Sequence, residues 1–355
     1  MRKPEIVMVT GAGAGLGRAI VRAFARRGAH VGLISRGRAR LEDARGEVER
    51  AGGRAVMLPA DIADAEAVEA AAARCEEELG PIDVWVNNAM TTVFSPIKDM
   101  TAEDFKRVTE VTYLGVVHGT QAALRRMLPR DRGVIVQIGS ALAYRSIPLQ
   151  SAYCAAKHAI VGFTDSLRSE LIHDRSRVRV TVVHMPALNT PQFSWCKSRM
   201  PRKAQPVPPI FQPEVGAEAV YWAAHHRRRE LSVGWPTIEA LWGQKFGAGL
   251  LDRYLASRAW DGQMYDGARG PGATTDLYEP VEGHQGARGS FDARSAERSF
   301  ALWAVTHRAL LGTCALGAAA GVLLGVLGSA VGAGPAARYT RALIDYTGRY
   351  IGGET

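Results

Sequence analysis

Short runs of apolar, mostly β-branched residues alternate with helix-length stretches rich in Ala, Arg and Glu from residue 5 onward. This alternation predicts parallel strands joined by crossover helices. Most of the apolar runs lack alternating polar residues, as is typical of strands covered on both faces. We therefore expect a doubly wound, Rossmann-like α/β fold with a seven-stranded parallel sheet. The predicted strands are IVMVT (6–10), HVGLIS (30–35), RAVML (54–58), IDVWVNNA (82–89), GVIVQIGS (133–140), VRVTVVH (178–184) and ELSVGW (230–235).

The segments between these strands have helical length and periodicity, and they predict helices over 16–27, 38–51, 64–79, 102–127 and 151–173. A chain of 355 residues is long for one ordinary domain. We expect a nucleotide-binding catalytic domain over 1–255. Residues 256–300 are rich in Gly and polar residues without a period, which predicts a loose linker. Residues 301–355 predict an apolar helix and tail.

The tail holds an uncharged stretch between Arg308 and Arg338, and within it 309–334 is long enough to cross a hydrocarbon layer as a helix. Gly317, Gly321 and Gly325 repeat every four residues, a spacing that lets apolar helices approach closely in a bilayer. Membrane contact through 309–334 is one interpretation. A helix packed on its own domain or on a partner is the other, because Ala and Gly are only weakly hydrophobic.

The net charge of +9 comes almost entirely from arginine, since only seven of the 44 basic residues are lysines. A basic solvated surface explains this excess, and phosphate ligands or anionic lipid are the alternatives. No block of Lys and Arg with interleaved aromatics occurs, so we expect no nucleic-acid partner. The four scattered cysteines and the His225–His226 pair lack ligand spacing, so no metal is expected. The N-terminus leads directly into a strand, which predicts a cytoplasmic catalytic domain.

A Gly-rich turn, VTGAGAGLGRA, follows the first predicted strand and opens the first helix. Gly11, Gly15 and Gly17 permit positive φ angles and a close approach of the backbone to a pyrophosphate at the helix N-terminus. A turn of this kind is a weak signal alone. Its place after strand one of an α/β chain indicates dinucleotide binding.

The end of the second strand is where such folds select the ribose of the cofactor. The sequence there has Ser35 and Arg36 and no carboxylate, which favours NADP(H) over NAD(H) because arginine binds a 2′-phosphate. Solvated loop charges are the alternative. Asp61, after strand three, is expected either to hold the adenine amino group or to cap the next helix.

Tyr153 and Lys157 lie four residues apart on a predicted helix, so their side chains share one face. An ammonium there lowers the pKa of a phenol and makes it a usable acid or base. Ser140 ends the fifth predicted strand, at the carboxyl edge where ligands bind, and its hydroxyl can hold a substrate oxygen.

These motifs together resemble the short-chain dehydrogenase/reductase family over roughly residues 4–255. The likeness lies in TGAGAGLG, in Asn87-Asn88-Ala89 after strand four, in Ser140, and in the Tyr153–Lys157 pair. It implies an enzyme that transfers a hydride between a nicotinamide and a carbonyl or alcohol, with Ser140, Tyr153 and Lys157 as catalytic residues. The cofactor-binding residues expected are Thr10, Gly11, Gly13, Gly15, Leu16, Gly17, Ser35, Arg36, Asp61, Ile62, Asn88, Ala89, Tyr153, Lys157, Pro186 and Thr190.

The sequence departs from the family pattern at three places. Met90 replaces a glycine beside the expected substrate cavity, and Ala187 replaces a glycine after Pro186. Thr112 replaces an asparagine that helps to relay protons to the lysine, so we count it with the catalytic residues and expect an altered relay. A nucleotide-binding sensor or membrane scaffold with little turnover is therefore the alternative function.

Residues 191–213 stand where the family has its substrate lid. Their apolar side chains predict either a hydrophobic carbonyl or alcohol substrate or simple packing on the body. We expect Met90, Leu142 and Phe193 to contact the substrate. The resemblance also implies a homodimer or homotetramer.

Overall fold

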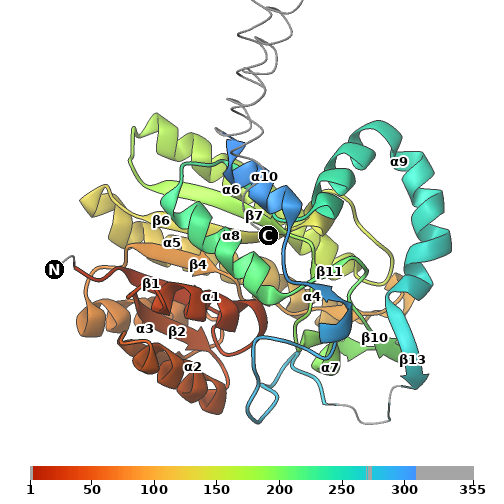
Figure 1. Ribbon diagram of the computed structural model, residues 1–355, viewed down its shortest axis with the longest axis horizontal. Coiled ribbons are helices and arrows are strands. Elements are labelled where there is room, and N and C mark those ends of the chain that lie inside the picture. The colour runs from red at the N-terminus through yellow and green to blue at the C-terminus, as the bar shows by residue number, and fades with distance from the viewer. Residues whose placement is uncertain (1–2, 269, 271–273, 309–355) are drawn as a thin grey trace, which may run out of the picture. The chain divides into compact units, whose positions relative to one another are not determined.

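The sheet of the protein has the predicted seven parallel strands, in the order β12-β7-β6-β4-β1-β2-β3. The computed structural model describes residues 3–268, 270 and 274–308. Each predicted strand forms, and β12 is three residues long. The strands are β1 (Ile6–Thr10), β2 (His30–Ser35), β3 (Ala55–Pro59), β4 (Val84–Asn87), β6 (Val134–Ser140), β7 (Arg179–Met185) and β12 (Glu230–Ser232). The predicted doubly wound α/β fold is confirmed (Figure 1).

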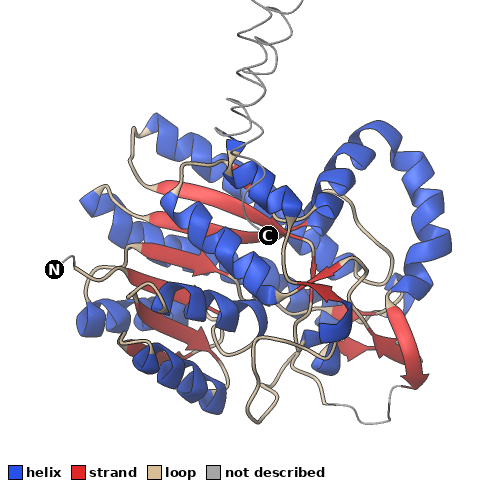
Figure 2. Cartoon of the chain, in the orientation of Figure 1, coloured by secondary structure: helices blue, strands red, loops and turns tan. Residues whose placement is uncertain are grey.

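Helices cover both faces of the sheet, which explains why its strands are apolar throughout (Figure 2). On one face α1 packs against α2 and α8, and on the other α3, α5 and α6 contribute to a large apolar cluster. The bounds of the larger helices are α1 (Gly15–Ala25), α2 (Arg38–Arg50), α3 (Ala65–Leu79), α4 (Ala102–Thr109), α5 (Gly115–Met127), α6 (Ser151–His173) and α8 (Pro213–His225).

The helix predicted over 102–127 is interrupted by a π-helical turn over Glu110–Leu114, which separates α4 from α5. Such turns insert an extra residue into a helix and are frequent near functional sites. Thr112 lies in the middle of this turn.

The carboxyl ends of β1 and β4 mark the place where the strand order reverses, because the chain runs from β1 outward to β2 and β3 and then returns to β4. Crevices at such switch points are the usual ligand sites of open α/β sheets. Thr10 ends β1 and Asn87 ends β4, so the Gly-rich turn and the Asn87–Ala89 motif meet there.

Short strands build a second layer over this edge. An antiparallel pair joins β10 (Arg202–Ala204) to β13 (Met264–Ala268), and a parallel pair joins β5 (Val93–Phe94) to β9 (Lys197–Ser198). A small parallel sheet holds the remaining three strands in the order β14-β11-β8. They are β8 (Ala187–Leu188), β11 (Ile210–Phe211) and β14 (Ser295–Ala296). The helix α7 (Gln192–Trp195) lies in this layer.

The described part of 256–300 is ordered where the sequence predicts a loose linker. Leu277, Ala287 and Phe291 are buried, and a 3-10 turn over Asp292–Arg294 leads into β14. We call residues 275–289 the strap. Its few apolar anchors lack a period, so their burial arises from tertiary contacts that composition does not reveal. Residues up to Leu302 accordingly form one compact unit.

Helix α9 (Trp235–Gly262) arches away from the sheet and bends at Gly247, whose backbone is not helical (Figure 1). Its N-terminal part belongs to the stretch that the sequence assigns to the catalytic domain, and it continues past residue 255. Near the end of the described chain, α10 covers Phe300–Thr306.

The apolar segment 309–334, for which membrane contact is predicted, lies outside the described residues. Among the helices that the structure describes, none combines the length and the apolar character that a membrane crossing needs.

Candidate active site

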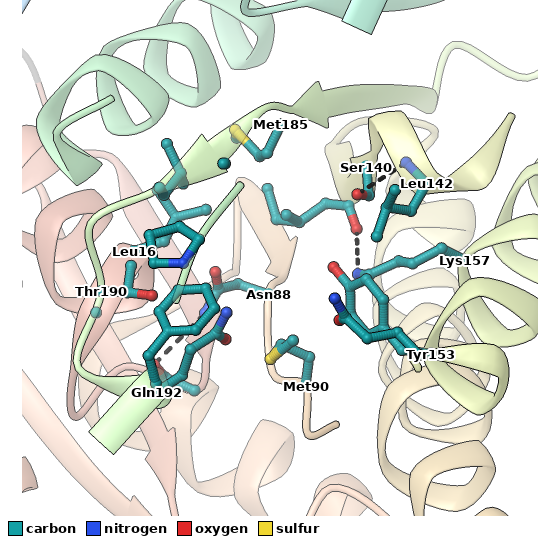
Figure 3. A pocket seen from close by; sticks show the side chains of 18 of the residues that line it. Leu16, Asn88, Met90, Ser140, Leu142, Tyr153, Lys157, Met185, Thr190 and Gln192 are labelled. Carbon is teal, nitrogen blue, oxygen red and sulfur yellow. Dashed lines mark hydrogen bonds between the residues drawn. The ribbon is translucent and has the colours of Figure 1, made fainter. Parts of the chain in front are cut away.

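A cavity of about 510 Å³ opens at the carboxyl edge of the sheet and runs from the Gly-rich turn to α9. Figure 3 shows Leu16, Thr190 and Gln192 on one side, Ser140, Tyr153 and Lys157 on the other, and Asn88 and Met90 between them. The cavity therefore joins the two predicted halves of the site, the nucleotide turn and the tyrosine helix.

The Gly-rich turn is held against β4 by a set of buried hydrogen bonds. Thr10 Oγ1 accepts from the backbone N–H of Asn88 at 2.9 Å and of Ala89 at 3.0 Å, and Asn88 Nδ2 donates to the Thr10 carbonyl at 2.9 Å. A Cβ on Gly17 would lie 2.0 Å from the Gly11 oxygen, and one on Gly11 would lie 2.9 Å from Asn88 Nδ2. Only glycine fits at both positions, so the motif TGAGAGLG is fixed by packing against the asparagine.

Helix α1 begins at Gly15, whose φ is +57°, with its N-terminus directed at the cavity edge. The first N–H groups of a helix have no partner within it and favour anions. In this structure the N–H of Gly15 donates to the carbonyl of Gly286, in the strap, at 3.1 Å.

Ser140, Tyr153 and Lys157 converge at the end of β6. Lys157 Nζ is buried and donates to the Ile138 carbonyl at 2.7 Å, and it lies 5.5 Å from the centre of the Tyr153 ring. Ser140 Oγ accepts from the Leu142 N–H at 3.1 Å. That bond leaves the Ser140 O–H available as a donor beside the Tyr153 phenol, whose pKa it lowers.

The electrostatics of this trio differ from the expectation that Lys157 lowers the pKa of Tyr153. Burial raises the pKa of Tyr153, and the group that lowers it is the Ser140 hydroxyl. Burial also lowers the pKa of Lys157 to about 7. A lysine that is only partly protonated near neutrality stabilises a phenolate less than a fully charged one.

Thr112 lies outside the cavity, although the sequence analysis counts it with the catalytic residues. Its hydroxyl donates to the Thr91 carbonyl at 2.9 Å and accepts from the Thr91 N–H at 3.1 Å. With both functions of the hydroxyl engaged, Thr112 joins the π-helical turn to the segment after β4. This arrangement differs from a relay to Lys157.

A hydrogen-bonded cluster of Tyr144, His184 and Glu230 holds the turn that follows Ser140. Tyr144 donates to Glu230 Oε2 at 2.5 Å, and its oxygen is 3.1 Å from His184 Nε2. The His184 hydrogen bond, with that from Tyr144, holds the pKa of Glu230 down to about 2 despite the opposing effect of burial. The cluster ties the η4 turn (Ala141–Ala143) to β7 and β12.

At the end of the cavity beside β2, Arg36 lines the cavity, but its donors bind the strap. Its Nη1 donates to the Tyr278 carbonyl at 2.7 Å, and its Nη2 donates to the Asp276 carbonyl. Asp61 also lines the cavity and pairs with Arg107, and it accepts from the Ala63 N–H at 3.0 Å. The N-cap of α3 is Asp64, whose side chain accepts from the N–H groups of Glu66 and Ala67, so the capping alternative for Asp61 is wrong and its cavity position remains.

Most predicted site residues surround the one cavity. The predicted residues in its lining are Gly11, Gly15, Leu16, Gly17, Ser35, Arg36, Asp61, Ile62, Asn88, Ala89, Met90, Ser140, Leu142, Tyr153, Lys157, Pro186, Thr190 and Phe193. The predicted residues Thr10, Gly13 and Thr112 lie outside this lining. The lining also holds residues that the predicted site leaves out, among them Arg40, Trp195, Asp276 and Leu251. Arg40 could have been predicted from the sequence, since it lies about one helical turn beyond Arg36. Asp276 could not, because nothing near it in the sequence indicates a site.

A family model described as short chain dehydrogenase matches residues 5–198, over half of the chain. The chain belongs to the short-chain dehydrogenase family. It is an oxidoreductase, and this family uses a nicotinamide cofactor and acts on alcohol or carbonyl groups.

This short-chain dehydrogenase is 31% identical over 280 residues to a Bacillus subtilis (strain 168) protein named uncharacterized oxidoreductase YxnA, with 78% of each chain covered. It is 27% identical over 232 residues to a fatty acyl-CoA reductase of Acinetobacter baylyi, with 65% of this chain and 76% of that protein covered. A solved structure, of a putative short-chain alcohol dehydrogenase from Sinorhizobium meliloti 1021, matches with a TM-score of 0.51 and 31% identity. That match covers 53% of this chain and 74% of the other.

Proposed function

We propose that this short-chain dehydrogenase transfers a hydride between NADP(H) and a hydrophobic carbonyl or alcohol, with Tyr153 as the general acid and base. The observation that carries the proposal is the convergence of Ser140, Tyr153 and Lys157 on the same cavity as the Gly-rich turn. A proton donor, a polarising hydroxyl and a nucleotide cradle are the parts that such a reaction requires.

The residues present fit a dinucleotide phosphate. The glycines at 11 and 17 let the turn pack closely against Asn88, and the turn and the N-terminus of α1 line the cavity. Arg36 and Arg40 line the adenosine end, and the buried Nε of Arg40 has no hydrogen-bond partner among the described residues. We assign the 2′-phosphate to these two arginines, because β2 ends without a carboxylate.

The side chains of the site divide the remaining work. The bound nicotinamide supplies or accepts the hydride. Tyr153 gives its phenolic proton to the substrate oxygen in the reductive direction and takes it back in the oxidative one. Ser140 donates to the same oxygen, while Lys157 neutralises the phenolate that Tyr153 leaves behind. Ser140 and Lys157 are buried and Tyr153 is partly buried, which limits the access of water to the proton transfer.

The far end of the cavity supports a hydrophobic substrate. Met90, Leu142 and Phe193 line it together with apolar residues of α9, including Leu251 and Leu255. Apolar walls with a few convergent polar groups are typical of sites for apolar small molecules. The relative named fatty acyl-CoA reductase favours the same class of substrate.

Replacing Tyr153 by Phe tests the proposal, with Tyr113→Phe as the matched control because Tyr113 does not line the cavity. We expect Y153F to lower NADPH-dependent turnover of long-chain aldehydes and ketones by a factor of about 10² or more, with NADPH affinity within about threefold of the wild type. Y113F should retain turnover. Undiminished turnover in Y153F would refute the assignment of the acid.

A protein that binds the nucleotide without turning over a substrate is the second candidate, and the low pKa of Lys157 and the hydrogen bonds of Thr112 favour it. A library of apolar aldehydes, ketones and alcohols separates the two functions. Steady oxidation of NADPH or reduction of NADP with any member supports the dehydrogenase. Tight nucleotide binding without turnover across the library supports the sensor.

A further inference from the structure

The strap closes the adenosine end of the cavity with backbone carbonyl groups. Within the described residues, the acceptors of the Arg36 and Arg40 guanidinium groups are the carbonyls of Asp276, Tyr278 and Val281. Gly286 caps Gly15 at the start of α1 in the same way. Peptide carbonyls stabilise these cations as dipoles and leave their charge in place.

The strap also brings one carboxyl group into the cavity. Asp276 lines it, and its carboxylate lies within electrostatic reach of both Arg36 and Arg40. Its backbone is held by Trp195, whose carbonyl accepts from the Asp276 N–H at 3.1 Å. The Arg40 guanidinium in turn stacks on the Trp195 ring, 4.6 Å from its centre.

Leu277 anchors the part of the strap that carries Asp276. Its side chain is fully buried in a cluster with Val93, Val108 and Ala152. Arg107 donates to the Leu277 carbonyl at 2.9 Å. Asp276 is thus held in place by the bond of its N–H to Trp195 and by the burial of the next residue, Leu277.

From this arrangement we infer that Asp276 determines how strongly the site discriminates between NADP(H) and NAD(H). The inference rests on the proposed function, and it concerns the adenosine end of that same site. A carboxylate beside the ribose accepts hydrogen bonds from a 2′-hydroxyl and repels a 2′-phosphate. Here β2 supplies the arginines that attract the phosphate, and the strap supplies the acid that opposes it.

Removal of this charge has a directional consequence. With Asp276 neutral, Arg36 and Arg40 face the 2′-phosphate without a competing anion, so NADPH should bind more tightly while NADH loses an acceptor. At the distances of a binding site, coupling between one carboxylate and a phosphate is worth about a tenfold change in affinity or more. The ratio of the two affinities therefore reports on Asp276, whatever the substrate.

Titrations of the full-length protein with NADPH and NADH, followed by nicotinamide fluorescence or calorimetry, test the inference. We expect Asp276→Asn and Asp276→Ala to raise the ratio of NADPH to NADH affinity by about tenfold or more. Asp276→Glu keeps the charge and should stay near the wild-type ratio. Glu282→Gln removes an exposed charge from the same strap and should leave the ratio unchanged.

Two results would overturn the inference, and they differ from each other. An unchanged or lower ratio in D276N and D276A, with both proteins folded by circular dichroism, would show that Asp276 does not discriminate while the cofactor assignment stands. Failure of the wild type and every variant to bind either nucleotide would refute the proposed function and the inference together.

Discussion

Lys157 on α6 donates its Nζ proton to the carbonyl of Ile138 on β6, at 2.7 Å and out of contact with solvent. The bond fixes the tyrosine helix to the strand that ends in Ser140. It also explains why the trio keeps its geometry although burial disfavours the charge of the lysine.

Lys157→Met tests the cost of this burial. The folded pKa of Lys157, about 7, lies below the value of 10.5 in an unfolded chain, so the unfolded state binds more protons between these values. Stability of the wild type should therefore rise from about pH 7 to about pH 9 relative to K157M, as urea denaturation at the two pH values would measure. A constant difference would show that the lysine is not desolvated. Turnover of K157M should fall at least about 100-fold.

Gly17→Ala tests the close packing of the Gly-rich turn. The added Cβ would lie 2.0 Å from the Gly11 oxygen, so the turn must shift. We expect a loss of about 1–3 kcal/mol in the free energy of unfolding together with weaker nucleotide binding. Gly46→Ala on α2 is the control, because nothing lies near its added Cβ, and it should raise stability by up to about 1 kcal/mol. Wild-type nucleotide affinity in G17A would contradict the close approach.

Arg36→Gln tests the assignment of the 2′-phosphate. Loss of a charge-assisted contact should weaken NADPH binding by about 10- to 100-fold and leave NADH binding nearly unchanged. The NADPH effect should shrink as salt is added. Arg26→Gln removes an exposed charge at the end of α1 and serves as the control. Equal weakening of both nucleotides would place the phosphate elsewhere.

Glu230→Gln tests the cluster beneath the Ser140 turn. The folded pKa of Glu230, about 2, lies below the usual 4.5, so its contribution to stability is present above pH 4.5 and is lost as the pH falls toward 2. E230Q should be less stable than the wild type by at most about 3 kcal/mol near neutrality. Chemical denaturation at about pH 6 and about pH 3.5 should show a smaller gap at the lower value. A gap that does not depend on pH would exclude the ionised carboxylate as its source.

Thr112→Val separates a support from a proton relay. Both hydrogen bonds to Thr91 disappear, so the free energy of unfolding should fall by about 1–3 kcal/mol, and Thr112→Ser should restore part of it. Turnover per folded molecule should change less than about threefold, because the hydroxyl does not reach the cavity. A fall of about 100-fold with intact stability would return Thr112 to the catalytic residues.

The features that the sequence predicts well are those with a local cause. Alternating apolar runs define the sheet, and the glycines at 11 and 17 are required by the backbone and by Asn88. Ser140, Tyr153 and Lys157 follow from the end of one strand and one face of the next helix. Each of these depends on neighbours in the chain or on parallel strand ends that meet at one edge.

The features that it misses depend on tertiary contacts. Burial raises the pKa of Tyr153 and lowers the pKa of Lys157, and the spacing of the two residues in the sequence does not predict either shift. Asp276 reaches Arg36 from 240 residues away through an aperiodic segment. The hydroxyl of Thr112 bonds to Thr91 beside the π-helical turn, a contact that the spacing in the sequence does not indicate.

The position of the strap late in the sequence has a consequence for the order in which the parts of the cavity are synthesised. The Gly-rich turn leaves the ribosome early, but Gly286, which accepts from the Gly15 N–H, and Asp276, which lines the cavity, are made only after all seven strands of the sheet. A chain cut short before the strap would contain all seven strands together with Ser140, Tyr153 and Lys157, but it would lack the carbonyl groups that bind Arg36 at one end of the cavity.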